Sequence, residues 1–276
     1  MSFVQNLLRY ISWLSLDVVL GAMAGMYFFA RLLHAPLQWP AYGLLALAVW
    51  VIYTTDHLLD IRGKERLDSS RRNFHAQNRL FLLIGVVLAT ILGGVGAFWW
   101  FGWGKELQLT LILAALILGS RLLIRKLGPG WMKEFSIAVF YVVGILWLPV
   151  IRAEAIDINW TAMSFVPIYI FLAFLNLLIL SFLDQREDEA AGYFSAAQTL
   201  TPQALIQVIR KLNFLLIFVA LGAFIVMPSF FRAFACVILI MALIHYLSFF
   251  NPRLASETKR IRMEWSFLLP ALLFAF

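Results

Sequence analysis

The sequence predicts an all-α fold, a polytopic bundle of membrane-spanning helices that forms a single transmembrane domain over residues 1–276. Of the 276 residues, 63% are hydrophobic and only 13% are charged, whereas charged residues approach a quarter of an ordinary soluble protein. The mean hydropathy is +0.87. Because a helix needs about 20 apolar residues to cross a bilayer, a chain of this length accommodates about nine spans and leaves no room for a soluble domain.

Apolar runs mark the candidate helices. They cover residues 11–33, 40–60, 80–101, 107–124, 134–151, 161–183, 206–227, 231–250 and 263–276. The first run carries Asp17 and is longer than the core of a signal peptide, so we expect it to remain in the mature protein. The last run is short for a hydrocarbon core of about 30 Å, and its status as a full span is open.

Basic residues predict the orientation of these helices, because cytoplasmic loops carry an excess of Lys and Arg. If the apolar runs alternate in direction, 18 of the 22 cations fall on one side of the membrane. We therefore expect an integral protein of the plasma or inner membrane with a cytoplasmic amino terminus. The net charge of +7 sits in short loops between apolar runs, which argues against a nucleic-acid partner. The single cysteine, Cys236, excludes an internal disulfide.

Two pairs of aspartates stand out among the seven in the chain. Asp56 with Asp60, and Asp184 with Asp188, are each four residues apart, where random placement would give about 0.2 such pairs. Each pair ends an apolar run, the second and the sixth, so both pairs are expected on the cytoplasmic side. Residues four apart share one helix face about 6 Å apart, so the two faces predict a site with four carboxylates.

Clustered carboxylates require cations, because like charges about 6 Å apart repel by roughly 3 kcal/mol at an effective dielectric constant of about 20. Oxygen-only ligands favour Mg²⁺, whose remaining positions are usually filled by water and substrate phosphate. We therefore expect Mg²⁺ and a ligand that carries a diphosphate. Taken singly, each nearby cation is equally typical of a cytoplasmic loop. The cations that are candidates for binding diphosphate are Arg62, Arg71, Arg72, Lys133 and Arg186.

Two blocks of sequence, YTTDHLLDIRG with the downstream RRNFH, and LSFLDQREDEAAGYFSAA, resemble the aspartate-rich motifs of the UbiA superfamily of intramembrane prenyltransferases. In that family the motifs end the second and sixth of nine helices, and the second motif has the spacing seen in Asp184, Asp188 and Gly192. The resemblance implies a UbiA-like arrangement of helices. It also implies Mg²⁺-dependent transfer of an isoprenyl group from an isoprenyl diphosphate to a lipophilic acceptor, which the sequence does not identify.

The resemblance assigns the catalytic, metal-binding role to Asp56, Asp60, Asp184 and Asp188. Arg71 or Arg72 resembles the loop arginine of the family, and Lys133 resembles a cation in its basic turn before the fifth helix. The first motif of the family usually opens with an Asn four residues before its central Asp, where this chain has Ile52. One metal ligand is therefore missing, and the alternative is a member that binds lipid without catalysis.

Three further residues are candidates for the cavity. Aromatic faces stabilise allylic cations, and Tyr53 and Tyr141 are potential sources. Asn176 lies eight residues before Asp184, on roughly the same helix face, although an interhelical hydrogen bond explains it equally. Asp17 is an acid inside a span and hence either functional or close enough to the interface to be solvated.

A membrane transporter is the competing hypothesis from another class. The two aspartate pairs are offset by the same 128 residues, as in an internal pseudo-repeat with acidic span ends near residues 60 and 188, and secondary transporters contain such repeats. Transporter sites usually lie near the bilayer midplane, whereas both pairs here lie at span ends beside Arg-rich loops. This position favours an enzyme.

Overall fold

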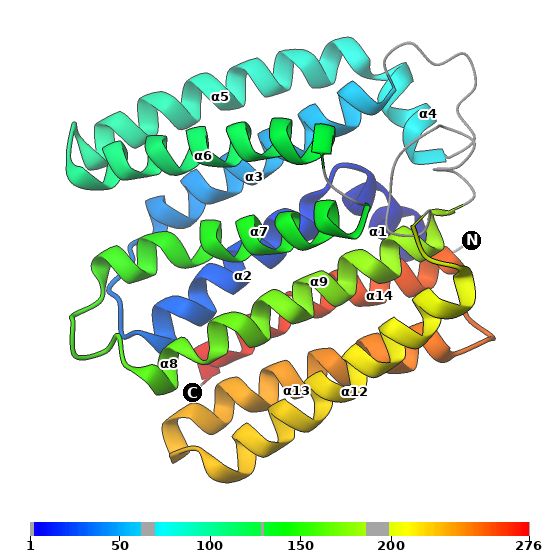
Figure 1. The fold of residues 1–276 in the computed structure, drawn as a ribbon. Helices are drawn as coiled ribbons and strands as arrows, with labels where there is room; N and C mark the ends of the chain where they lie inside the picture. The colour runs from blue at the N-terminus through cyan, green and yellow to red at the C-terminus, as the bar shows by residue number, and fades with distance from the viewer. Residues whose placement is uncertain (1–2, 62–69, 128–129, 186–198, 276) are drawn as a thin grey trace.

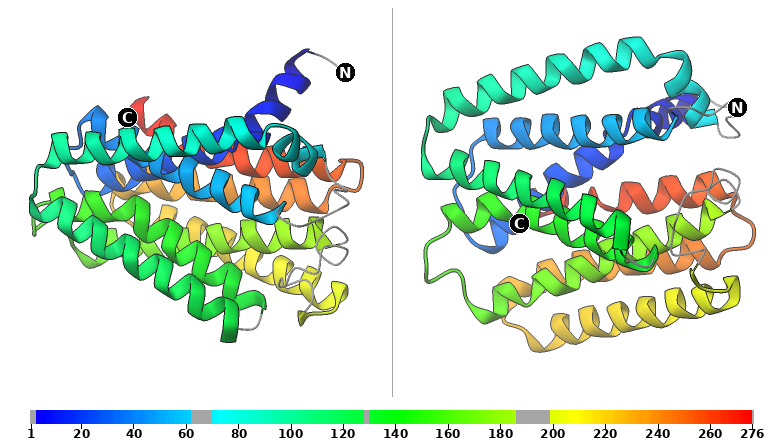
Figure 2. Two further views of the ribbon diagram at one scale, coloured as in Figure 1. Left: turned by 90° about the horizontal axis from the view of Figure 1, so that it is seen from above. Right: turned by 45° about the horizontal axis from the view of Figure 1, so that its top comes forward.

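The computed structural model describes residues 3–61, 70–127, 130–185 and 199–275, and within these ranges the chain forms helices and turns without a strand. The predicted all-α fold is therefore confirmed. The helices lie alongside one another in one bundle (Figure 1, Figure 2). In chain order the elements are α1 (Phe3–Trp13), α2 (Leu16–Leu32), α3 (Trp39–Asp60), α4 (Ser70–Gln77), α5 (Arg79–Phe101), α6 (Lys105–Leu127), α7 (Gly130–Arg152), α8 (Trp160–Met163), α9 (Phe165–Leu183), α12 (Pro202–Val226), α13 (Ser229–Phe250), α14 (Ser256–Ser266) and the 3₁₀ helix η1 (Leu269–Ala275).

Six helices in the described part of the chain are long and apolar enough to cross a membrane. A seventh is reached if α1 and α2, which are bent relative to each other by 74°, form one span. Such helices are characteristic of a membrane protein, although the expected count of about nine is not reached by this criterion. The six stretches are Trp39–Leu59, Arg79–Phe101, Trp131–Arg152, Trp160–Leu183, Pro202–Val226 and Ser229–Phe250.

The expected helix over residues 11–33 is broken near its start. Ser15 has a φ of 56°, in the left-handed region that a continuous α-helix does not use, and the chain changes direction there. As a result α1 projects from the bundle (Figure 2). The sequence did not predict this break, because the segment is apolar on both sides of Ser15 and contains no Gly or Pro at that point. The turn keeps the polar residues Ser12, Ser15 and Asp17 buried inside the protein.

The last apolar run, over residues 263–276, does not form one continuous α-helix either. Its first residues end α14, and η1 follows after a short interruption. Pro270 lies inside this run and lacks the N–H group that an α-helix would use at that position. This segment is therefore shorter and less regular than a standard span.

Helix α2 occupies the centre of the core, where it packs against α3, α7, α14 and η1. Phe28 and Phe29 of α2 are fully buried, and the ring of Phe28 lies 5.4 Å from that of Tyr169 on α9. Gly25 permits α7 and α9 to approach α2 closely, since a Cβ atom there would lie 2.7 Å from Cδ1 of Ile145 on α7 and 3.1 Å from the hydroxyl oxygen of Tyr169 on α9. The outer helix α5 is mostly exposed in contrast to α2, because only 11% of an 18-residue apolar stretch of α5 is buried inside the protein.

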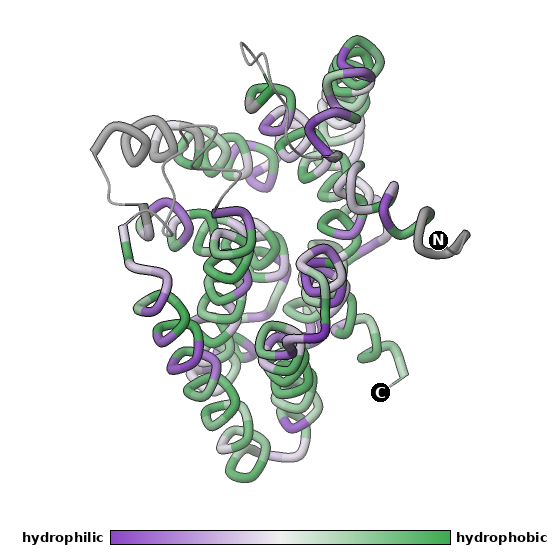
Figure 3. The backbone as a smooth tube through the Cα atoms, turned by 90° about the vertical axis from the view of Figure 1, so that its right-hand side faces the viewer, coloured by the Kyte–Doolittle hydropathy of each residue, from purple (hydrophilic) through white to green (hydrophobic). Residues whose placement is uncertain are grey.

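The bundle has two distinct ends. Helices α1 and α4, the end of α9 and the start of α14 gather at the end that lies on the right in Figure 1. The loops after α7 and α12 lie at the opposite end. Figure 3 views the bundle from the first end and shows mainly hydrophobic tubes along the helices, with hydrophilic segments among them.

Candidate functional site

A cavity of about 200 Å³ lies at the α1/α4 end of the bundle. Seven helices contribute to its wall, namely α1, α2, α3, α4, α7, α9 and α14. Apolar side chains such as Leu177 and Leu180 form part of the lining, and polar groups form the rest. An apolar pocket with a few converging polar groups is the usual form of a binding site.

Six of the residues singled out in the sequence line this cavity: Asp17, Tyr53, Arg71, Tyr141, Asn176 and Asp184. They come from α2, α3, α4, α7 and α9 and from the residue that ends α9, so the fold brings both aspartate-rich blocks to one place. This convergence could not be read from one-dimensional spacing.

The other predicted residues fall into two groups. Asp56 is partly buried on α3, where its neighbour His57 and the preceding Tyr53 line the cavity, but Asp56, Arg72 and Lys133 are not part of the cavity lining. The remaining side chains, those of Asp60, Arg62, Arg186 and Asp188, lie outside the described part of the chain.

Asp184 forms an ion pair with Arg260 of α14. Nη2 of Arg260 donates a hydrogen bond to Oδ1 of Asp184, and both residues line the cavity. The side chains are only 16% and 24% exposed, so the pair is largely shielded from water. Arg260 thus balances the charge of the predicted metal ligand and presents a guanidinium group at the same place.

Arg71 and His57 form the adjoining wall, and His75, which is not part of the cavity lining, contacts both of them. His75 Nδ1 donates a hydrogen bond to the backbone oxygen of Arg71 at 2.9 Å, and the ring of His57 lies 4.8 Å from the ring of His75. Burial and then the charge of Arg260 lower the pKa of Arg71, while burial lowers the pKa of His75. Burial thus favours the neutral form of His75. Arg71 is the second guanidinium group in the cavity, besides that of Arg260.

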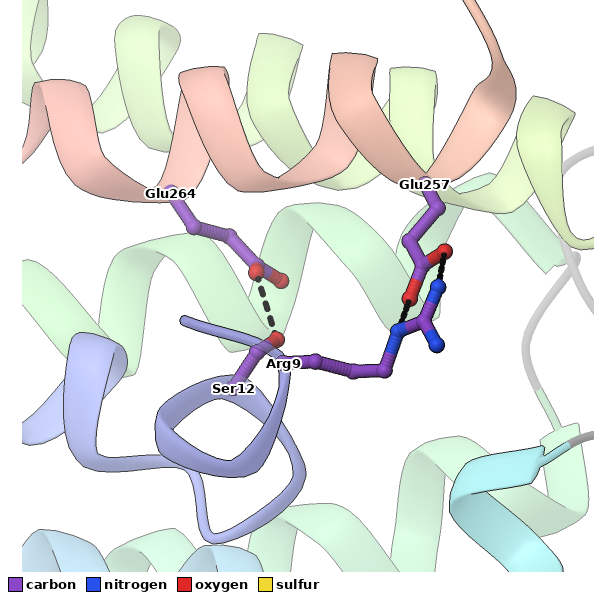
Figure 4. Close-up of polar contacts among 4 residues, drawn as sticks. All are labelled: Arg9, Ser12, Glu257 and Glu264. Carbon is purple, nitrogen blue, oxygen red and sulfur yellow. Dashed lines mark hydrogen bonds and ion pairs between the residues drawn. The ribbon is translucent and has the colours of Figure 1, made fainter. Parts of the chain in front are cut away.

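A carboxyl pair occupies the wall formed by α1, α2 and α14. Asp17 and Glu264 are 1% and 9% exposed, and both line the cavity as neighbouring groups. Ser12 Oγ donates to Glu264 Oε2 at 3.3 Å, as Figure 4 shows. Burial, and then the adjacent Asp17, raise the pKa of Glu264 to about 8; Glu264 belongs to α14, which is not one of the membrane-crossing helices.

A bidentate ion pair holds α1 against α14 beside this wall. Arg9 contacts the two carboxylate oxygens of Glu257 at 2.6 and 2.8 Å (Figure 4). This contact positions the broken amino-terminal helix over the cavity. It is more exposed than the carboxyl pair, with side-chain exposures of 28% and 48%.

Asn176 has both of the roles considered for it. It lines the cavity, and its Oδ1 lies 3.2 Å from Nε2 of His245 on α13. His245 is fully buried, and its Nδ1 donates to the backbone oxygen of Met241 at 2.8 Å. The His245 contact therefore fixes the orientation of an amide group that faces the cavity.

Arg260, Glu264 and His57 line the cavity but were not predicted from the sequence. A signal for two of them was present, because Arg260 and Glu264 are four residues apart and share one face of α14, as the aspartate pairs do on their helices. The pairing of an arginine with a glutamate at this spacing is also common on solvated helices, so the spacing alone is a weak signal.

The described donors suit Mg²⁺ in kind but do not form a complete site. Asp184 brings a carboxylate to the cavity lining, and carboxylate oxygen is the ligand type that Mg²⁺ prefers, whereas Oδ1 of Asn176 contacts His245. Within residues 3–61, 70–127, 130–185 and 199–275, no group of three or more His, Cys, Asp or Glu side chains is placed to hold a metal ion.

Comparisons with protein-family models, curated proteins and solved structures gave no match for this chain.

Proposed function

We propose that this protein is a UbiA-like intramembrane prenyltransferase that transfers an isoprenyl group from an isoprenyl diphosphate to a lipophilic acceptor. The observation that carries the proposal is the convergence of Tyr53, Arg71, Asn176 and Asp184 on one cavity. Tyr53, Arg71 and Asp184 belong to two blocks that are distant in the sequence and that contain carboxylates and cations suited to Mg²⁺ and diphosphate, and Asn176 lies just before the second block.

The helix order is compatible with nine passes through the bundle. Taken in turn, the passes are α1–α2, α3, α5, α6, α7, α8–α9, α12 and α13, and η1, which follows the non-crossing helix α14, would be the short ninth. The two aspartate pairs then follow the second and sixth passes, as the UbiA resemblance implies. We propose that the cavity end faces the cytoplasm, because most of the Lys and Arg residues lie in the segments at that end.

The cavity walls suit the head of the donor substrate. Arg71 and Arg260 present guanidinium groups, which match the geometry of phosphate oxygens. The volume of about 200 Å³ is below the usual range of about 300–1,000 Å³ for drug-sized ligands, so the cavity accommodates the diphosphate and the reacting carbon. The isoprenyl chain would extend between apolar helices.

The residues of the chain have separate tasks in this reaction. Mg²⁺, held by Asp56, Asp60, Asp184 and Asp188, would supply charge neutralisation for the departing diphosphate.

The cations of the cavity stabilise the charge that develops on the leaving diphosphate, because they are already oriented before the reaction. The aromatic rings of Tyr53 and Tyr141 can stabilise a positively charged allylic carbon. The apolar part of the lining limits capture of that carbon by water.

Two observations support a second function, the binding of a phosphorylated lipid without transfer. Arg260 already pairs with Asp184, and Ile52 replaces the Asn expected in the first motif. Both features reduce the number of oxygen ligands free for a metal. A transporter is less well supported, because the cavity lies at one end of the bundle rather than at its centre.

Binding of tritiated geranylgeranyl diphosphate to the purified protein, with and without Mg²⁺, tests the proposal. We expect binding that requires Mg²⁺ and that is abolished in Asp56→Ala and Asp184→Ala, while Asp157→Ala at the opposite end binds normally. Binding without Mg²⁺ and without transfer to any acceptor would favour the second function. Equal affinity in wild type and both aspartate variants would rule out the assigned site.

A further inference from the structure

We propose that Asp17 and Glu264 bind the acceptor substrate and receive its proton, and that the acceptor is a neutral lipophilic molecule with a hydroxyl group. This inference rests on the proposed prenyltransferase function and extends it to the second substrate. It assigns a task to a wall of the cavity that belongs to neither aspartate-rich block.

The break between α1 and α2 builds this wall. The left-handed turn at Ser15 lets Ser12, Ser15 and Asp17 all line the cavity, opposite Glu264 of α14. A straight helix through residue 15 would direct these polar groups differently, and some would meet lipid. The fold thus concentrates two carboxyl and two hydroxyl groups in a largely apolar region.

Asp17 has an unused hydrogen-bond acceptor at the cavity. Its Oδ1 accepts from the backbone N–H of Val18 at 2.9 Å, whereas its Oδ2 is buried without a hydrogen-bond partner among the described residues. A buried polar atom without a partner is costly, so such an atom indicates a ligand or a catalytic role. A hydroxyl group of a bound molecule would satisfy it.

The charge of the wall selects against anionic acceptors. The Glu264 carboxyl lies beside that of Asp17, and burial raises the pKa of Glu264 to about 8, so its carboxyl is neutral near pH 7. The negative charge of Asp17, which contributes to this rise, is balanced by the nearby cations Arg71 and Arg260. An acceptor carboxylate would add a second negative charge to this buried place, whereas a neutral hydroxyl donates a hydrogen bond to it.

The two sites are close enough to act together. Arg260 and Glu264 lie one helical turn apart on α14, about 6 Å along the axis, and Arg260 contacts Asp184 on the donor side. In the transfer step the hydroxyl oxygen forms a bond to the allylic carbon. The bond from that carbon to the diphosphate oxygen breaks, and its electron pair leaves with diphosphate. The hydroxyl proton passes to the carboxylate of the pair.

Binding of simple acceptor analogues to detergent-purified protein tests this assignment. The probes are tritiated 4-octylphenol, displaced in a scintillation proximity assay by unlabelled 4-octylphenol, its methyl ether or 4-octylbenzoate. For wild type we expect 4-octylphenol to bind about tenfold more tightly than either analogue, as for one hydrogen bond to a charged group. Equal affinity for the phenol and the ether would overturn the proposal.

Matched variants separate this site from the donor site. Asp17→Asn and Glu264→Gln should each lose the preference for the phenol while they bind geranylgeranyl diphosphate within about twofold of wild type. Glu257→Gln makes the same chemical change on α14 outside the cavity and should keep the preference. Unchanged preference in both carboxyl variants would overturn the proposal.

The same assays distinguish failure of the acceptor site from failure of the proposed function. A wild type that prefers the phenol but binds no geranylgeranyl diphosphate supports the hydroxyl site and contradicts prenyl transfer. A wild type that binds geranylgeranyl diphosphate but does not prefer the phenol contradicts the acceptor site alone.

Discussion

The two ends of the helical bundle both carry ion pairs, but the pairs differ in their surroundings. At the cavity end, Arg260 and Asp184 are mostly buried and face a cavity. At the opposite end, Arg152 contacts Glu106 at 2.9 Å with side-chain exposures of 42% and 23%. A contact of 3.0 Å between His34 and Asp157 there is similarly open, with 57% of the His34 side chain exposed.

This difference indicates which charges have a task beyond linking helices. Exposed pairs lose little hydration and contribute between 0 and about 1 kcal/mol to stability. Burying charges costs far more, and replacing a buried pair with apolar residues is often neutral or stabilising. Charged groups kept buried around a cavity, with Asp17 Oδ2 unpartnered among the residues that the structure describes, are therefore better evidence for a functional site than the exposed pairs are.

The largest expected difference between the ends is topological. Ser229 and Ser256 flank α13 and are exposed at opposite ends of it. In a background with Cys236→Ala, we expect a membrane-impermeant maleimide added outside cells to label Ser229→Cys and not Ser256→Cys. The physical reason is the concentration of Lys and Arg at the cavity end, which retains that end in the cytoplasm. Labelling of only Ser256→Cys would reverse the orientation.

Substrate binding should also differ sharply between the ends. Arg71→Met removes a guanidinium from the cavity, and we expect the affinity for geranylgeranyl diphosphate to fall by between tenfold and a hundredfold, because hydrogen bonds to charged groups are worth about 1.5–3 kcal/mol. Arg152→Met is the matched control and should bind within about twofold of wild type. Titration of the labelled diphosphate measures both, and comparable losses would contradict the placement of the site.

Stability should respond next most strongly at the buried pair. Arg260→Met leaves Asp184 without its cationic partner, so we expect the unfolding free energy to fall by about 3 kcal/mol. Urea unfolding in detergent, followed by tryptophan fluorescence, measures this loss. If the double variant Arg260→Met with Asp184→Leu does not recover stability, the loss comes from other contacts of Arg260.

The pH dependence of stability should reveal Glu264. Burial raises its pKa from an ordinary value of 4.5 to about 8, so between these values the folded protein holds a proton that the unfolded chain releases. Stability should therefore fall as the pH rises through this window. Asp17 of α2, Arg71 of α4 and Arg260 of α14 face this carboxyl and remain in the variant.

Glu264→Gln should flatten this pH dependence, which thermal melts between pH 5 and pH 9 measure as a drop of a few degrees in wild type. Glu257→Gln provides the control, because Glu257 pairs with Arg9 on the exposed side of α14. A wild type and a Glu264→Gln variant with the same slope would show that Glu264 does not change protonation in this range.

The smallest effect belongs to the exposed pair at the other end. Arg152→Met should change the unfolding free energy by less than about 1 kcal/mol, because solvent and salt screen its contact with Glu106. The same urea unfolding assay measures it. A loss comparable to that of Arg260→Met would remove the contrast between the ends.

Most helices could be predicted from composition and apolar runs. The runs over residues 40–60, 80–101 and 231–250 correspond closely to α3, α5 and α13. The prediction of one continuous helix in the first run was wrong, because that run breaks at Ser15, and the last run, whose status was open, divides between α14 and η1. Hydropathy averages over a window, so it cannot detect a single residue in a left-handed conformation or an irregular terminal turn.

The candidate site was predictable only in part. The positions of Asp184 and Asn176 pointed to the face of α9 that lines the cavity. Arg260 and Glu264 were missed, because an oppositely charged pair at helical spacing is common on solvated surfaces. Asp17 was an ambiguous candidate until the structure placed it beside Glu264.

The amino-acid sequence by itself determined that this protein is a helical membrane protein, because apolar runs of sufficient length specify helices wherever the backbone must satisfy its own hydrogen bonds. It also determined where carboxylates repeat along one helix face. Only the tertiary structure decided which of these faces meet. The partners of Asp17 and Asp184 come from α14, far along the chain, and such contacts depend on how helices pack rather than on local spacing.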